Sequence, residues 1–158
     1  MNGATLKTLR EALCLPVKWL ANVAGVQERT VRYWESGHMP VPADVDAQMR
    51  QLEAVAASLV NQGVEAIRAQ IAAHGLPGEP VRLVRYVEDE DIARYLPELT
   101  GVPATYHAAV LARIRWSIEA DDVEVEMHAL DVAAYSAWLK STKQVDSTAM
   151  RAQFVALE

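Results

Sequence analysis

The stretch Ala24–Gly37, AGVQERTVRYWESG, decides the fold that the sequence predicts for the first part of the chain. Gly25 indicates a tight turn, and the closing Ser-Gly pair is a helix-stop signal, so we expect a helix between them. At helical spacing Val31 and Trp34 fall on one side and the charged residues fall on the other. The sequence therefore predicts a short helix with one buried side and one polar side.

A second short helix is expected just before this turn, over Pro16–Ala21 with proline in its first turn. An earlier helix over Thr5–Leu15 presents a stripe of leucines at spacings of three and four, which predicts burial. Two short helices joined by a tight glycine turn form a helix-turn-helix.

These residues resemble the Xre/Cro-type helix-turn-helix repressors of phages and bacteria. The features that carry the resemblance are Leu20-Ala21, Gly25-Val26, Thr30-Val31 and Glu35-Ser36-Gly37. The string from Arg29 to Gly37, followed by Val41-Pro42-Ala43-Asp44-Val45, is similar to a narrower family of small bacterial DNA-binding proteins that includes the second class of anti-CRISPR-associated regulators. The resemblance implies double-stranded DNA as a partner.

The helix expected from Gln27 to Ser36 would be the recognition helix, because such helices place their N-terminal residues at base edges in the major groove. We expect base contacts from Gln27, Glu28, Arg29, Arg32 and Tyr33. Arginine suits guanine O6 and N7, glutamate suits the cytosine amino group, and tyrosine can meet a phosphate or a thymine methyl group. The alternative is a charged surface helix with an internal Glu28–Arg32 pair, worth only a few tenths of a kcal/mol.

Phosphate contacts are expected from Lys18, Lys7 and His38, although each of these side chains is also a normal solvated surface residue. The Xre pattern usually has a glutamine near the start of the second helix, and this chain has Val17 there. That departure leaves Lys18 and the N-terminal amides of the helix as the expected anchors. We expect Trp19 in the core rather than at the rim of the DNA contact.

Arg10 allows two interpretations: a phosphate contact, or a structural ion pair with Glu35. The resemblance favours the ion pair, because an arginine in the first helix of these repressors commonly pairs with the glutamate of the Glu-x-Gly ending.

The rest of the chain predicts a mainly α fold with a small β component (α+β): an N-terminal lambda-repressor-like bundle, a long connecting helix and a C-terminal α+β dimerisation domain. We place the DNA-binding domain at 1–60, the dimerisation domain at 61–140 and a tail or loosely held helix at 141–158. The expected elements are a helix from Ala43 or Asp44 to His74, strands Val81–Val87 and Val123–His128, a helix over Asp89–Leu99, a helix capped by Thr105 and a helix from Asp131 to Leu139.

Charge is unevenly distributed along the chain. Residues 1–42 carry five lysines or arginines against three glutamates, a net charge of +2. Because the formal net charge of the whole chain is −6, residues 43–158 carry a net charge of −8. Because phosphate attraction is screened over about 8 to 10 Å, a basic face can function on an acidic chain if the acidic part is held away from the duplex.

The lone Cys14, between two leucines, predicts a buried thiol. No apolar run reaches the roughly 20 residues of a membrane span, and no signal-peptide core is present, so we expect a cytoplasmic protein.

Enzymatic chemistry has little support in the sequence. The carboxylates Asp121, Asp122, Glu124 and Glu126 lack the EF-hand spacing, and we interpret them as a solvated strand edge whose charges discourage aggregation. His74, His107 and His128 are scattered, so no zinc motif is present. Walker, nucleophile-elbow and dinucleotide motifs are absent. We therefore expect no cofactor, no metal and no enzymatic activity.

The leading functional hypothesis is a homodimeric, sequence-specific transcriptional repressor that binds an inverted-repeat operator with half-sites about 10 bp apart or a multiple of that. The alternatives are an antitoxin whose C-terminal half binds a toxin, an RNA-binding regulator, and a regulator that senses a small molecule in its C-terminal unit. A membrane partner is not expected.

Overall fold

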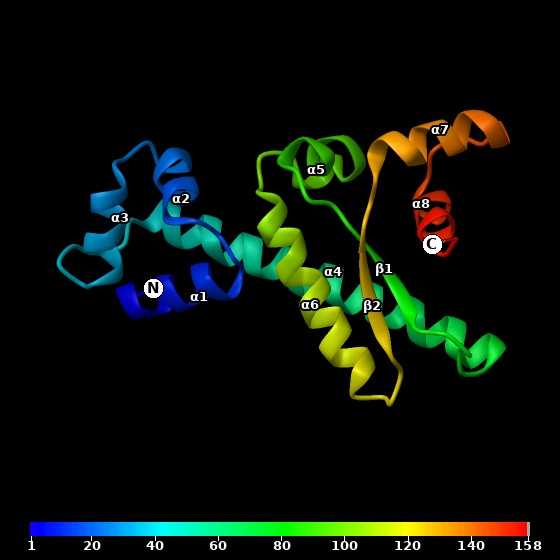
Figure 1. Ribbon diagram of the computed structural model, residues 1–158. Coiled ribbons are helices and arrows are strands. Elements are labelled where there is room, and N and C mark those ends of the chain that lie inside the picture. The colour runs from blue at the N-terminus through cyan, green and yellow to red at the C-terminus, as the bar shows by residue number, and fades with distance from the viewer. Residues whose placement is uncertain (158) are drawn as a thin grey trace.

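The computed structural model describes residues 1–157 and is mainly helical with one small sheet, as the sequence predicts (Figure 1). The elements in chain order are α1 (Gly3–Ala12), α2 (Val17–Val23), α3 (Glu28–Glu35), α4 (Ala43–His74), β1 (Val81–Arg85), α5 (Asp89–Tyr95), the 3-10 helix η1 (Pro97–Leu99), α6 (Ala104–Glu119), β2 (Val125–Ala129), α7 (Val132–Thr142) and α8 (Thr148–Val155).

The first three helices and the start of α4 enclose one apolar core. Leu6 of α1, Leu20 of α2, Val31 of α3 and Met49 of α4 are all fully buried, which confirms the leucine stripe and the inward side of the third helix. Trp34 is buried beside them. The apolar residues that recur at helical spacing in α1 and α3 are therefore the residues that line this core.

Helix α4 runs without a break from the N-terminal bundle to the far end of the molecule, past the expected boundary at residue 60 (Figure 1). Helix α6 packs along it. The hydroxyl of the fully buried Tyr106 on α6 donates to the carbonyl of Leu52 at 2.7 Å. Helix α4 thus belongs to both halves of the structure. Packing against α6 covers part of the apolar side of α4.

The two strands pair in parallel, with Val81 beside Val125 and Arg85 beside Ala129. Helix α6 contacts both strands, and α8 packs against β1. Val125 is buried in the core, while Glu126, the next residue along β2, is exposed. The alternation of apolar and polar residues that predicted this strand therefore corresponds to its buried and exposed faces.

Three sequence expectations differ from the structure. Cys14 is exposed rather than buried, because it follows the end of α1 with φ of 51°, a left-handed residue that turns its side chain out of the core. Thr105 does not cap α6, whose N-cap is Pro103; its hydroxyl instead donates to the carbonyl of Cys14 at 2.7 Å. The segment expected to be a tail or loose helix contains α8, whose Val155 is fully buried.

Within residues 1–157, no helix combines the length and the apolar character needed to cross a lipid bilayer.

Candidate nucleic-acid interface

Helix α3 separates its buried and exposed residues cleanly. Val31 is fully buried and Trp34 is 4% exposed, while Glu28, Arg29 and Arg32 are exposed. The turn before the helix depends on Gly25, whose φ of 65° is in the region that glycine adopts without strain. The apolar side chains therefore fix α3 on the bundle and leave its charged side in solvent.

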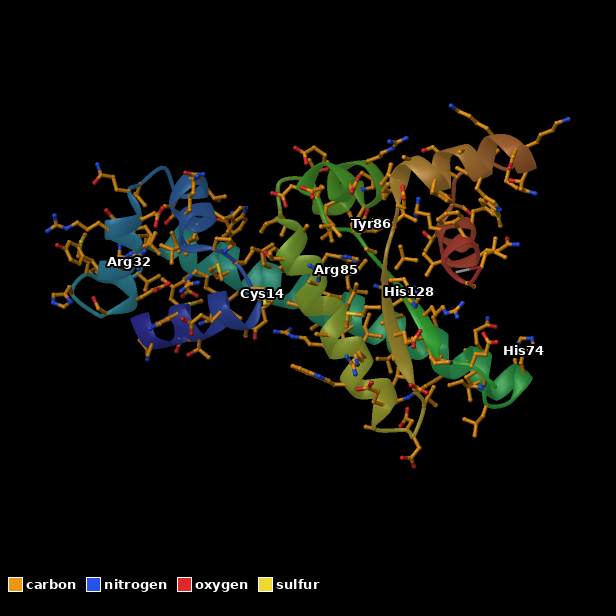
Figure 2. The ribbon with its side chains drawn as sticks, viewed as in Figure 1. Cys14, Arg32, His74, Arg85, Tyr86 and His128 are labelled. Atoms are coloured by element: carbon orange, nitrogen blue, oxygen red, sulfur yellow. The ribbon has the colours of Figure 1, made fainter. Side chains whose placement is uncertain are left out.

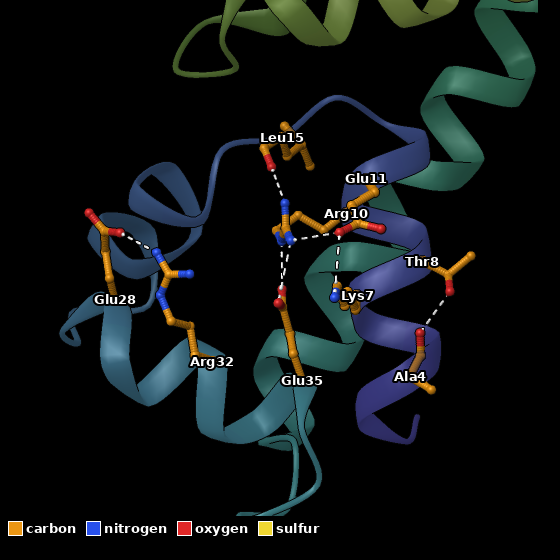
Figure 3. A network of polar contacts seen from close by, with 9 residues as sticks. All are labelled: Ala4, Lys7, Thr8, Arg10, Glu11, Leu15, Glu28, Arg32 and Glu35. Carbon is orange, nitrogen blue, oxygen red and sulfur yellow. Dashed lines mark hydrogen bonds and ion pairs between the residues drawn. The ribbon is translucent and has the colours of Figure 1, made fainter.

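A buried ion pair holds the end of α3 against α1 (Figure 3). The Arg10 guanidinium donates through Nε to Glu35 Oε1 at 2.6 Å and through Nη2 to Glu35 Oε2 at 3.3 Å. Its Nη1 donates to the carbonyl of Leu15 at 2.9 Å. The side chain of Arg10 is only 9% exposed and that of Glu35 is 8% exposed. Arg10 therefore forms the structural ion pair and does not face solvent, where a phosphate would bind.

Arg29 and Tyr33 form a second, exposed unit one turn apart on α3. Arg29 Nε donates to the Tyr33 hydroxyl at 2.6 Å, and the guanidinium carbon lies 5.0 Å from the centre of the tyrosine ring. Because this bond uses Nε, the two Nη groups remain available as paired donors. Such a pair matches the two acceptors of a guanine edge in the major groove.

Gln27, Glu28 and Arg32 are exposed, which agrees both with a recognition helix and with a merely charged surface helix. Gln27 is the exposed N-cap, and its side chain makes no capping bond. Arg32 Nη2 lies 3.4 Å from Glu28 Oε2, the internal pair that a merely charged surface helix would also show (Figure 3). An exposed pair of this kind contributes only about 0.3 to 0.5 kcal/mol, so either partner can exchange it for a base contact at small cost.

The expected phosphate-contacting residues lie on α1, on α2 and in the segment that follows α3. Lys7 is exposed on α1, 4.0 Å from Glu11, and lines a groove of about 260 Å³ together with Arg32, Glu35 and Ser36. His38 follows α3, with its Nδ1 2.8 Å from the Ser36 hydroxyl and its ring 5.8 Å from that of Tyr33. Lys18 is exposed on α2.

Sequence reasoning missed the residues that join the N-terminal bundle to the rest of the molecule. Trp19, expected in the core, is partly buried, and its Nε1–H donates to the carbonyl of Gly101 at 2.8 Å. Arg113 on α6 donates to the carbonyl of Ala12 at 3.1 Å, beside the bond from Thr105 to Cys14. All three bonds are from a side chain to a distant carbonyl, a partner that carries no sequence signal.

Of the histidines and carboxylates that were considered as metal ligands, His128 and Glu126 lie together, with Nε2 of the histidine 3.1 Å from Oε2 of the glutamate. Among residues 1–157, no group of three or more His, Cys, Asp or Glu side chains is close enough to hold a metal ion. Figure 2 shows His74 at one end of α4 and His128 on β2. His107 is buried within α6, where its ring lies 5.2 Å from that of Tyr86.

The fold and the exposed side of α3 define a mainly helical protein with a polar, arginine-bearing face at one end. The chain belongs to the Aca2/YdiL-like family, a family of regulators, whose model matches residues 1–133. That match includes the N-terminal bundle, α4 and both strands, and it ends at the start of α7. No curated protein matches the sequence.

Proposed function

We propose that this protein is a sequence-specific DNA-binding transcriptional regulator of the Xre/Cro helix-turn-helix type, and that it acts as a homodimeric repressor in the cytoplasm without enzymatic activity. In this proposal α2 and α3 are the two helices of the motif. Helix α3 is the recognition helix, and its first two turns enter the major groove.

The observation that carries the proposal is the exposed side of α3. Arg29 and Arg32 lie on it one turn apart, with Gln27 and Glu28 at its start, while Val31 and Trp34 anchor the other side. Figure 1 shows α3 at one end of the molecule, with α7 and α8 at the other end. The acidic remainder of the chain therefore need not approach a duplex that α3 contacts, and screening over about 8 to 10 Å makes the basic face effective.

A homodimer follows from the small size of the recognition unit. One α3 offers few base contacts, and two copies related by a twofold axis add theirs on an inverted repeat. Occupation of such a site over a promoter excludes the polymerase, which is why repression is proposed rather than activation.

The test is binding of the purified protein to the DNA upstream of its own gene, compared with random DNA of equal length across a salt series. Arg29→Ala is expected to lower affinity for the specific site by about ten- to a hundred-fold, the value of one bidentate base contact, with little effect on random DNA. Lys18→Ala, which removes a phosphate contact, is the matched control and should weaken both complexes about equally.

Equal losses from Arg29→Ala on both DNAs would contradict its role as a base-contacting residue. Wild-type protein that prefers neither DNA, at any salt concentration where it stays folded, would overturn the proposed function. A tighter complex with a structured transcript than with any duplex would favour an RNA-binding regulator instead.

A further inference from the structure

Two separate connections join the N-terminal bundle (α1, α2, α3 and the start of α4) to the C-terminal unit (β1 through α8). The first is α4 itself, which packs along α6. The second is a set of three side-chain hydrogen bonds that begin or end within residues 101–113, on α6 and just before it. Units joined by a single connection are expected to move relative to each other, and a second connection restricts that motion.

The donors of these three bonds, which we call the junction clamp, are Trp19, Thr105 and Arg113. Trp19 on α2 donates to the carbonyl of Gly101 at 2.8 Å. In the opposite direction, Thr105 donates to the carbonyl of Cys14 at 2.7 Å and Arg113 donates to that of Ala12 at 3.1 Å. Figure 2 shows Cys14 on the side of the bundle that faces α6. The junction clamp therefore holds α2 and the end of α1 to the C-terminal unit.

The connection between α1 and α2 is bonded on two sides. Cys14, whose φ of 51° is left-handed, accepts from Thr105 on the side of α6. The carbonyl of the next residue, Leu15, accepts from Arg10 Nη1 at 2.9 Å. The same guanidinium binds Glu35 at the end of α3 (Figure 3). A contiguous set of polar contacts thus connects α6 with the end of α3.

We propose that the junction clamp fixes the orientation of α3 relative to the C-terminal unit, and that it thereby sets the distance between the half-sites that the protein accepts. Its three members are positioning residues, because they act through the bundle and need not touch DNA. This inference deepens the proposed function and rests on its homodimer. In that homodimer the separation of the two α3 helices depends on the angle between bundle and C-terminal unit in each copy.

Small rotations at the junction would be enough to change that separation. Ala43 begins α4, and the carbonyl of Leu52 on the same helix accepts from Tyr106 of α6. At 1.5 Å per residue these two positions on α4 are about 14 Å apart. A tilt of about 15° over that length displaces the bundle by about 4 Å, roughly the length of one base-pair step. A held junction therefore distinguishes spacings that differ by one base pair, whereas a loose junction accepts both.

The dependence of affinity on half-site spacing tests this positioning role. The probes are the duplex that footprinting delimits upstream of the gene, and duplexes with one or two base pairs removed from or inserted at its centre. The wild type should prefer the native spacing over a change of one base pair by roughly ten-fold or more. The double variant Thr105→Val/Arg113→Met removes two donors and keeps most of the side-chain volume. It should reduce that preference to about three-fold or less.

Two variants are matched controls for the double variant. Thr105→Ser keeps the hydroxyl donor and should keep the spacing preference of the wild type. Arg115→Met removes the same charge from α6, but Arg115 pairs with Glu119 at 2.7 Å and not with the bundle, so the preference should again be kept. All variants should still discriminate an intact half-site from a mutated one, because the exposed side of α3 is unchanged. A merely structural role of the junction clamp would instead lower affinity for every duplex by a similar factor.

The orientation itself is measured without DNA. In a Cys14→Ser background, which keeps the carbonyl that Thr105 uses, nitroxide labels at the exposed positions Asn22→Cys on α2 and Lys140→Cys on α7 report the distance between the two units by pulsed electron paramagnetic resonance. An excess of unlabelled protein restricts the signal to pairs within one chain. Adding Thr105→Val/Arg113→Met should broaden the distance distribution by about two-fold.

An equally narrow distribution with and without the two substitutions would overturn the inference. A broader distribution with an unchanged spacing preference would also overturn it, as would a wild type that binds a single half-site as tightly as the paired ones. A wild type that prefers no DNA, in which the two substitutions still broaden the distribution, defeats the proposed DNA-binding function and supports the orienting role of the junction clamp.

Discussion

Arg10 and Glu35 join α1 to α3 through a bidentate ion pair that is almost completely buried. Removing one partner of such a pair leaves an uncompensated buried charge, so we expect Glu35→Ala to lower the free energy of unfolding by about 3 to 5 kcal/mol. Urea denaturation at neutral pH measures the loss. The double variant Arg10→Met/Glu35→Leu, which removes both charges and keeps apolar volume, should lose clearly less. Equal losses from the single and double variants would contradict the importance of an unpaired charge here.

A close backbone approach between α1 and α3 makes the Gly3 position intolerant of a side chain. A Cβ there would lie 2.0 Å from the carbonyl oxygen of Trp34 and 2.8 Å from that of Glu35. In an open helix, replacing glycine by alanine stabilises by up to about 1 kcal/mol, but a clash with backbone cannot be relieved by rotating a side chain. We therefore expect Gly3→Ala to lower the thermal midpoint by several degrees, equivalent to about 2 kcal/mol or more.

Gly78→Ala is the matched control for that substitution. A Cβ at Gly78 meets no atom within 4 Å. Its effect should stay within about 0.5 kcal/mol of zero. Similar midpoints for the Gly3 and Gly78 variants would show that α1 can move away from α3 freely.

The parts of the fold that the sequence predicts are those encoded by local periodicity. Val31 and Trp34 lie three residues apart, and both are buried, because a helix turns the same side inward at that spacing. The alternation around Val125 likewise predicted a half-buried strand. Asp131 was expected to cap a helix, and its carboxylate accepts from the Ala134 N–H at 2.9 Å.

The parts that it did not predict depend on distant partners. The bonds from Trp19 to Gly101 and from Thr105 to Cys14 connect residues more than 80 positions apart, and in each case the acceptor is a carbonyl that every residue possesses. The burial of α8 depends in the same way on a distant partner: Arg151 lies over the ring of Tyr95, 4.9 Å from its centre, and pairs with Asp146 at 2.8 Å. Local pattern cannot reveal such contacts, which is why the last segment was expected to be loose.

The buried imidazole of His107 should make stability depend on pH. Burial, together with the positive charge of Arg85, lowers the pKa of His107 to about 4, while the same group in the unfolded chain titrates near 6.5. The folded state therefore favours the neutral ring, and its contribution is complete above about pH 6.5. It is lost as the pH falls toward about 4, because protons then bind preferentially to the unfolded chain, and the total corresponds to roughly 3 kcal/mol.

His107→Phe keeps a ring beside Tyr86 and removes the titration, so comparing the two proteins isolates this contribution from those of the carboxylates. Relative to the variant, the wild type should lose unfolding free energy by about 1 kcal/mol for each pH unit between pH 6 and pH 4.5, measured by urea denaturation. His74→Gln, at an exposed histidine, should follow the wild type throughout. A constant difference between wild type and His107→Phe across this range would mean that the ring is protonated in the folded protein or is reached by water, and that α6 is packed less tightly around it than its burial indicates.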